Sequence, residues 1–149
     1  MKKFIWMASL LASVSFGTVL IVIPQPAAAD HHEDAAKHAY SVIDAAALEK
    51  MIKEEKNLVI IDSRGEKYMG DGTIIKGAKH LGADKTDAES LAKLLASKDT
   101  PVAFYCSDVN CPASESAAHK ATELGYTRVY KYPGGLADWK EKKLPTDKL

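Results

Sequence analysis

Two short apolar runs constrain the fold of this chain more than any other feature. Residues 57–62, NLVIID, and residues 101–105, PVAFY, are apolar at consecutive positions rather than at alternate ones. Continuous aliphatic and β-branched runs of this length are typical of strands buried on both faces, as in a parallel sheet. We therefore expect a parallel sheet covered by helices on both of its faces.

Segments with helical spacing alternate with these and further strand candidates. Asp44 is a candidate N-cap for a helix over residues 45–55, which carries Leu48, Met51 and Ile52 on one side. The alternation predicts an α/β domain with a mostly parallel sheet of about five strands and helices on both faces. The expected strands lie within 40–43, 57–62, 73–81, 101–105 and 127–132, and the expected helices within 45–55, 84–99, 112–125 and 136–143.

Residues 1–29 have the layout of a secretory signal peptide. Lys2 and Lys3 precede an apolar run over residues 4–23, and the small residues Ala27 and Ala29 follow two prolines. The run is long enough for a retained transmembrane anchor, but the small-residue cleavage pattern favours removal. We expect periplasmic or secreted localisation, with a mobile mature N-terminus at 30–37 and the domain at 38–149.

Size and charge narrow the classes of partner. Removal of residues 1–29 from the 149-residue chain leaves 120 residues, enough for one domain, with 18 basic and 20 acidic side chains. No basic face is evident, so the sequence argues against nucleic-acid binding. No second long apolar run follows the leader, so we expect no stable membrane association after cleavage.

Only two cysteines are present, and they bound one loop. Cys106 directly follows the strand candidate 101–105, and Cys111 directly precedes the helix candidate 112–125. Ligands of open α/β sheets bind at such strand-to-helix loops, where unpaired helix amides can hold an anion or a thiolate. Cys106 is therefore a candidate nucleophile, although an exported protein can also keep a disulfide here. The loop residues between the cysteines, which we expect to bind the anionic group, are Ser107, Asp108, Val109 and Asn110.

The spacing argues against two families that place cysteine at such a loop. Tyrosine-phosphatase-like enzymes need arginine six residues after the nucleophile, because its guanidinium binds the phosphate oxygens in pairs. That position is Pro112 here. Thioredoxin-like sites need two residues between the cysteines, and this loop has four.

The chain resembles the single-domain rhodanese-like proteins, the sulfurtransferase fold, over roughly residues 38–145. The resemblance rests on LVIIDSRGEKYMGDGTIIKGAKHL, on VAFYCSDVNC, and on AAHKATELGYTRVYKYPGGLADWK. It implies that Cys106 accepts sulfane sulfur as a persulfide and passes it to a thiol or cyanide, without a cofactor. Asp62 and Arg64 match the family's Asp-x-Arg positions, where they either hold the neighbouring loops or contact substrate.

Two features depart from the family pattern. The loop has no cation and carries Asp108, which disfavours thiosulfate and favours a polysulfide or protein persulfide as donor. Cys111 occupies the last loop position, where it can resolve the Cys106 persulfide, protect Cys106 from over-oxidation, or form a structural disulfide. Two alternative functions stay open: a non-catalytic binding or regulatory module, and periplasmic thiol–disulfide exchange by Cys106 and Cys111.

The new N-terminus after cleavage offers one candidate metal site. In Asp30-His31-His32, a free amine, two amides and a third-position imidazole can form a square-planar site for copper(II) or nickel(II). We favour a polar tail at this segment. The sequence predicts no other metal site, and the expected partners are a small sulfur-containing substrate or a partner protein thiol.

Overall fold

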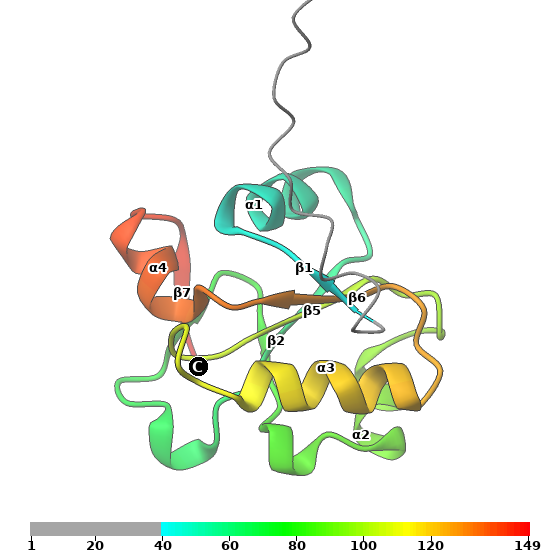
Figure 1. Ribbon diagram of the computed structural model, residues 1–149. Coiled ribbons are helices and arrows are strands. Elements are labelled where there is room, and N and C mark those ends of the chain that lie inside the picture. Colours follow the sequence, from blue (N-terminus) through cyan, green and yellow to red (C-terminus); the bar gives the residue numbers. More distant parts are fainter. Residues whose placement is uncertain (1–39) are drawn as a thin grey trace, which may run out of the picture.

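A computed structural model describes residues 40–149 of the chain (Figure 1). The expected signal peptide at 1–29, the N-terminal segment 30–37 and the candidate metal ligands Asp30, His31 and His32 lie outside the described residues. Within residues 40–149, no helix has the length and hydrophobicity needed to span a bilayer.

The main sheet has five strands in the order β1-β6-β5-β2-β4, and every neighbouring pair is parallel. The two continuous apolar runs form its centre, which confirms the expected parallel sheet. The strands are β1 (Ser41–Val42), β2 (Val59–Asp62), β4 (Lys79–His80), β5 (Val102–Tyr105) and β6 (Val129–Tyr132).

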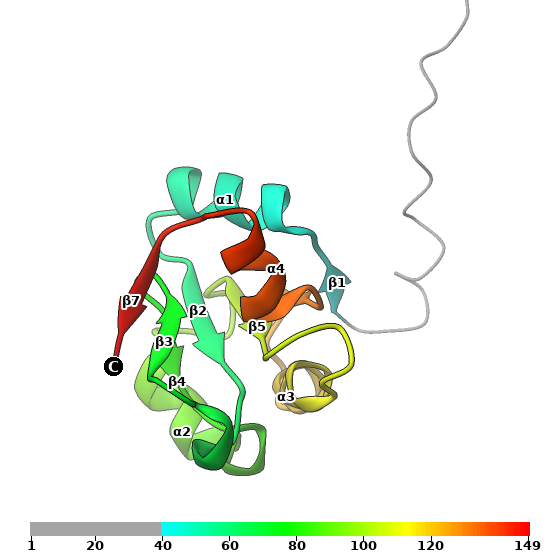
Figure 2. The ribbon, with the colours of Figure 1, turned by 90° about the vertical axis from the view of Figure 1, so that its left-hand side faces the viewer.

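Helices cover both faces of this sheet (Figures 1 and 2). Helices α1 (Ala45–Glu54) and α4 (Gly135–Glu141) lie on one face, and α2 (Ala88–Leu94) and α3 (Ala113–Glu123) lie on the other. Successive strand residues point to opposite faces, so Ile60 joins the core beneath α1 and α4 while Ile61 joins the core beneath α2 and α3. This two-sided burial explains why β5 and the first three positions of β2 are apolar, while Asp62 at the end of β2 is buried as the partner of Arg64.

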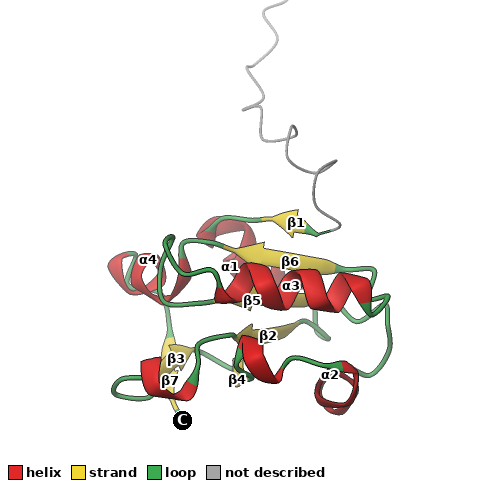
Figure 3. Ribbon diagram, turned by 60° about the horizontal axis from the view of Figure 1, so that its bottom comes forward, coloured by secondary structure: helices red, strands yellow, loops and turns green. Residues whose placement is uncertain are grey.

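The segment 73–81, expected to hold one strand, contains two strands in different sheets. β3 (Thr73–Ile75) pairs antiparallel with β7 (Thr146–Lys148) in a separate two-stranded sheet, whereas β4 joins the main sheet (Figure 3). Gly77 lies between them with φ of 77°, a left-handed conformation that glycine adopts without steric cost. The expectation of a single strand is therefore wrong, and β7 was not expected.

Helix caps follow the expected chemistry. The Asp44 carboxylate accepts from Ala47 N at 2.8 Å, which confirms the N-cap of α1. At α2, Asp87 and Ser90 act together as a capping box. Ile52, expected with Leu48 on the apolar side of α1, is 39% exposed, whereas Leu48 is fully buried.

Candidate active site

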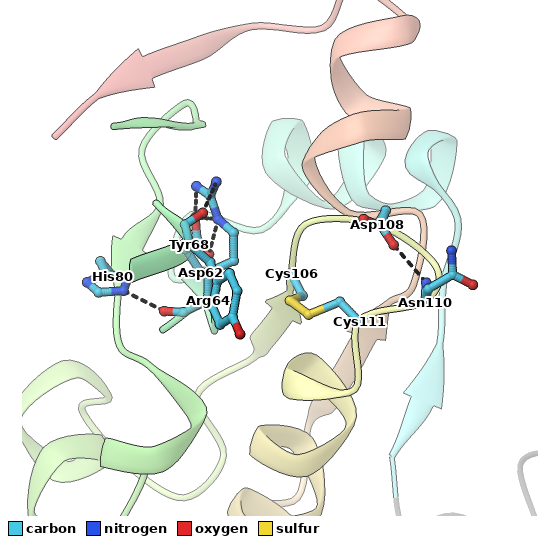
Figure 4. Close-up of a disulfide and its surroundings, with 8 residues drawn as sticks. All are labelled: Asp62, Arg64, Tyr68, His80, Cys106, Asp108, Asn110 and Cys111. Carbon is cyan, nitrogen blue, oxygen red and sulfur yellow. Dashed lines mark hydrogen bonds and ion pairs between the residues drawn. A yellow bond between two sulfur atoms is a disulfide. The ribbon is translucent and has the colours of Figure 1, made fainter. Parts of the chain in front are cut away.

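Cys106 is the first residue after β5, at the carboxyl end of a central strand. Its side chain is only 1% exposed and is joined by a disulfide to Cys111, which is half-buried (Figure 4). The two α-carbons lie 6.1 Å apart, a separation usual for disulfides. The loop therefore brings the two sulfur atoms together at the junction between β5 and α3, where the sequence predicted a nucleophile.

The four residues between the cysteines form a tight turn around Asp108. The Asp108 carboxylate accepts from Asn110 N at 2.9 Å, and its carbonyl oxygen accepts from Cys111 N at 3.1 Å. Val109, at the tip of the turn, is 73% exposed. Among the described residues, the amides of Ser107, Asp108 and Val109 have no hydrogen-bond acceptor.

Helix α4 supports the loop from the other side. Leu136 N donates to the carbonyl oxygen of Cys106, and Ala137 N donates to that of Ser107, both at 2.9 Å. These first-turn amides have no partner inside a helix, and the loop carbonyls satisfy them. The approach requires glycine, because a β-carbon at Gly135 would lie 2.6 Å from the Cys106 carbonyl oxygen.

Asp62 and Arg64 form a buried ion pair beside the loop. Asp62 is fully buried, Arg64 is 5% exposed, and Arg64 Nε lies 3.0 Å from both carboxylate oxygens of Asp62. Arg64 Nη2 also donates to Asp62 at 2.6 Å and to the carbonyl oxygen of Thr73 at 2.7 Å. Burial alone would lower the pKa of Arg64, but the hydrogen bond and charge of Asp62 outweigh it and raise that pKa.

Tyr105 connects this ion pair to the strand that ends at Cys106. Its hydroxyl donates to Asp62 at 2.9 Å and accepts from Ile75 N at 3.1 Å. Burial, followed by the negative charge of Asp62, raises the pKa of Tyr105 well above its usual range. The guanidinium of Arg64 is engaged by Asp62 and Thr73, and the role of the Asp-x-Arg pair stays a prediction.

Two adjoining pockets open beside the cysteines. One, of about 450 Å³, is lined by Cys106, Cys111 and the loop residues Ser107, Asp108 and Asn110, together with Arg64. The other, of about 500 Å³, is lined by Ser63, His80 and the charged residues of two short 3-10 helices, η1 (Glu66–Tyr68) and η2 (Ala83–Lys85). The pockets share Gly65, Tyr68 and Ala113.

Histidine 80 belongs to the scaffold of this second pocket. Its Nε2 donates to the carbonyl oxygen of Arg64 at 2.7 Å, which ties β4 to the segment that follows β2 (Figure 4).

Among residues 40–149, no group of three or more His, Cys, Asp or Glu side chains is arranged to hold a metal ion.

Residues 44–142 match the family model described as the rhodanese-like domain. The chain belongs to the rhodanese-like family. The matched range includes all four α-helices, the Asp62–Arg64 pair and the whole cysteine loop. This confirms the family and the α/β fold that the sequence motifs indicated.

Solved structures below 25% identity share the rhodanese-like fold. A Bacillus halodurans protein is 24% identical with a TM-score of 0.64, covering 74% of this chain and 77% of that one. The polysulfide-sulfur transferase homodimer of Wolinella succinogenes is 24% identical with a TM-score of 0.61, covering 76% and 82%. A Pseudomonas aeruginosa thiosulfate sulfurtransferase is 16% identical with a TM-score of 0.59, covering 76% and 21%. No curated protein matches the sequence.

The structure of this rhodanese-like domain thus places Cys106, Cys111 and Arg64 around one pocket, together with the loop residues Ser107, Asp108 and Asn110. Val109 is exposed and lies outside this lining, and Asp62 is fully buried. Sequence reasoning missed the contributions of Gly135 and Tyr105. The Pro-Gly-Gly segment at 133–135 precedes a predicted helix, but no local pattern indicates its contact with the cysteine loop. Tyr105 has the pattern of an ordinary buried strand residue, and its hydrogen bonds span 30 and 43 positions of sequence, too far for a local signal.

Proposed function

We propose that this rhodanese-like domain transfers sulfane sulfur through a persulfide on Cys106. The observation that carries the proposal is the position of Cys106 at the carboxyl end of β5, lining a pocket of about 450 Å³. The unpaired loop amides of Ser107, Asp108 and Val109 and the N-terminus of α3 favour negative charge on sulfur there.

The disulfide form must be opened before Cys106 can react. An external thiolate attacks the sulfur of Cys111, the more exposed cysteine, and expels Cys106 as a thiolate. A second thiolate then attacks the external sulfur of that mixed disulfide, and Cys111 leaves as a thiolate. The pair gains two electrons, and the external thiols leave as one disulfide.

Sulfur transfer then takes two displacement steps. The Cys106 thiolate attacks the outer sulfur of a polysulfide or protein persulfide; the donor's sulfur–sulfur bond breaks and its remainder leaves as an anion. An acceptor thiolate next attacks the outer sulfur of the Cys106 persulfide, and Cys106 leaves as a thiolate. Each step breaks one sulfur–sulfur bond and forms another, so the transfer itself consumes no reductant.

Cys111 provides a second exit for the bound sulfur. Its thiolate attacks the inner sulfur of the Cys106 persulfide, hydrosulfide leaves, and the disulfide forms again. The sulfane sulfur gains two electrons, which the two cysteines supply. The α-carbon separation of 6.1 Å allows this bond to form without large backbone movement.

The charges around the pocket favour a donor other than thiosulfate. Of its charged lining residues, Arg64 is paired with Asp62 and Asp108 is negative. A dianion such as thiosulfate would therefore find no unpaired cation in this lining, whereas a protein persulfide or a singly protonated polysulfide carries one negative charge. A polysulfide or a protein persulfide is the donor class we propose, in the periplasm or outside the cell, as the leader sequence predicts.

A transfer assay tests the function. The reduced protein is supplied with polysulfide or thiosulfate, and transfer to cyanide or to a small thiol is followed. We expect faster transfer from polysulfide, loss of transfer in Cys106→Ser, and retained transfer without re-formed disulfide in Cys111→Ser. Absence of transfer from every donor would assign the domain to the non-catalytic binding class.

Thiol–disulfide exchange is a second candidate function, and the Cys106–Cys111 disulfide is the observation that favours it. The two functions differ in their use of Cys111. Exchange of a substrate disulfide requires both cysteines, whereas persulfide transfer requires only Cys106. A Cys111→Ser protein that still transfers sulfur but no longer oxidises thiols separates them.

A further inference from the structure

Ser63 carries a buried hydroxyl group with no partner. Its residue is 0% exposed, and Ser63 Oγ has no hydrogen-bond partner among the described residues. The backbone of Ser63 is fully used: its N–H donates to Tyr105 O at 2.8 Å, and its carbonyl accepts from Ala83 N at 3.1 Å. A buried hydroxyl without a partner is costly, so a second state of the protein that supplies an acceptor would stabilise it.

The strand register places Ser63 beside Cys106. Asp62 pairs with Tyr105 in the parallel β2–β5 ladder, and the bond from Ser63 N to Tyr105 O continues that ladder. Ile61 and Phe104 both join the core beneath α2 and α3. Ser63 and Cys106 lie two residues further along, so their side chains point to this same face.

The pockets connect the same two side chains. Ser63 lines the pocket of about 500 Å³, and Cys106 lines the one of about 450 Å³. Both are also lined by Gly65, Tyr68 and Ala113, so the space beside the Cys106 sulfur continues toward Ser63.

We propose that Ser63 Oγ donates a hydrogen bond to the sulfur on Cys106 whenever the disulfide is open. In the disulfide, the Cys106 sulfur is uncharged and a weak acceptor, which explains why the hydroxyl has no partner in this structure. A thiolate or a persulfide anion is a charged acceptor, and hydrogen bonds to charged acceptors are stronger. The donor thus stabilises the ionised, nucleophilic form of Cys106 and holds its sulfur in the pocket.

This role of Ser63 deepens the proposed function. The hydrogen bond to a Cys106 persulfide rests on that function, whereas the hydrogen bond to the Cys106 thiolate can be measured independently. The full chain carrying Cys111→Ser leaves Cys106 as the sole thiol. The rate of its alkylation by iodoacetamide is measured against pH, with Ser63 intact and with Ser63→Ala. Ser63→Thr keeps a hydroxyl donor at the same position. Thr100→Ala is the control, because it removes a buried hydroxyl just before the start of β5, and Cys106 follows the opposite end of that strand.

The parent protein and all the variants in this assay have the same charged and titratable groups near Ser63 and Cys106. On the Cys106 side they are Arg64, Asp108 and Tyr68, which lines both pockets. On the Ser63 side they are Glu66, Lys67, Tyr68, His80, Asp84 and Lys85, of which Glu66 and Lys85 form an ion pair. A change specific to Ser63→Ala therefore reports the hydroxyl itself.

We expect Ser63→Ala to raise the midpoint of the alkylation profile by about one pH unit, as loss of a donor to a charged acceptor predicts. Ser63→Thr and Thr100→Ala should keep the parent midpoint. An unchanged midpoint in Ser63→Ala, or an equal shift in Thr100→Ala, would overturn the proposal. No sulfur donor enters this assay, so its result is independent of whether Cys106 forms a persulfide.

Discussion

Gly135 lies directly against the carbonyl oxygen of Cys106. A β-carbon at Gly135 would lie 2.6 Å from that oxygen and 2.8 Å from Asp108 N, and Gly135 has φ of 64°. The missing side chain lets Leu136 N reach the Cys106 carbonyl. The loop that carries the candidate nucleophile is therefore held by α4 as well as by β5 and α3.

Substitution of Gly135 should disturb this contact. For Gly135→Ala we expect a loss of roughly 2–5 kcal/mol of unfolding free energy, combining overpacking with a left-handed backbone. Gly125→Ala is the matched control, because Gly125 has φ of 83° but nothing within 4 Å of its β-carbon position. Denaturant unfolding compares them, and equal losses in the two variants would contradict the contact.

The Asp62–Arg64 pair should act mainly on stability. Asp62→Asn leaves the Arg64 charge buried without its counter-charge, so we expect a loss of about 3–5 kcal/mol of unfolding free energy. Glu49→Gln, which breaks the exposed pair with Lys53, should cost less than about 1 kcal/mol. Urea unfolding at pH 7 measures both, and an Asp62→Asn protein as stable as Glu49→Gln would refute the structural role.

Tyr105 should make stability fall at high pH. Its pKa is raised in the folded protein, so above pH about 10 the unfolded chain loses this proton before the folded one does. The contribution of Tyr105 to the free energy of unfolding is fully present below that pH, and above it this contribution decreases by about 1.4 kcal/mol per pH unit. Tyr132, whose pKa is raised by burial and by its hydrogen bond to Asp138, should add a similar slope.

Tyr105→Phe should therefore reduce the slope of unfolding free energy above pH 10 by about 1.4 kcal/mol per pH unit. At pH 7 the same variant should lose about 1–3 kcal/mol, because Asp62 and Ile75 N lose a partner. Tyr132→Phe should reduce the slope by a similar amount. A slope that neither variant changes would contradict the assigned pKa directions.

Reduction of the disulfide should leave the domain folded. The two cores on the faces of the sheet do not depend on Cys111, and closure of a six-residue loop contributes about 2 kcal/mol in the chain-entropy description. Thermal unfolding with and without reductant, with Cys111→Ser as a second measure, tests this. Complete unfolding on reduction would make the pair a structural requirement rather than a reactive one.

The features set by local chemistry were predictable from the sequence. The two-sided apolar runs identified β2 and β5, Asp44 identified the start of α1, and the strand-to-helix position singled out Cys106. These signals lie within a few residues of the feature that they predict. The family motifs added the order of the elements.

The features that depend on distant contacts were not predictable. β7 is the polar sequence Thr-Asp-Lys and has no strand pattern; it pairs with β3, and Lys148 forms an ion pair with Asp71. Gly135 shows its function only through its contact with Cys106. Ser63 lies between Asp62 and Arg64, and only the register of β2 against β5 brings it next to Cys106.

The central claim is that Cys106 carries the transferred sulfur, and mapping a persulfide tests it most directly. The reduced protein is exposed to polysulfide, free thiols and persulfides are capped, and peptides are analysed by mass. We expect a gain of one sulfur atom on Cys106 that Cys111→Ser retains and Cys106→Ser abolishes. A gain that persists in Cys106→Ser and disappears in Cys111→Ser would contradict the account.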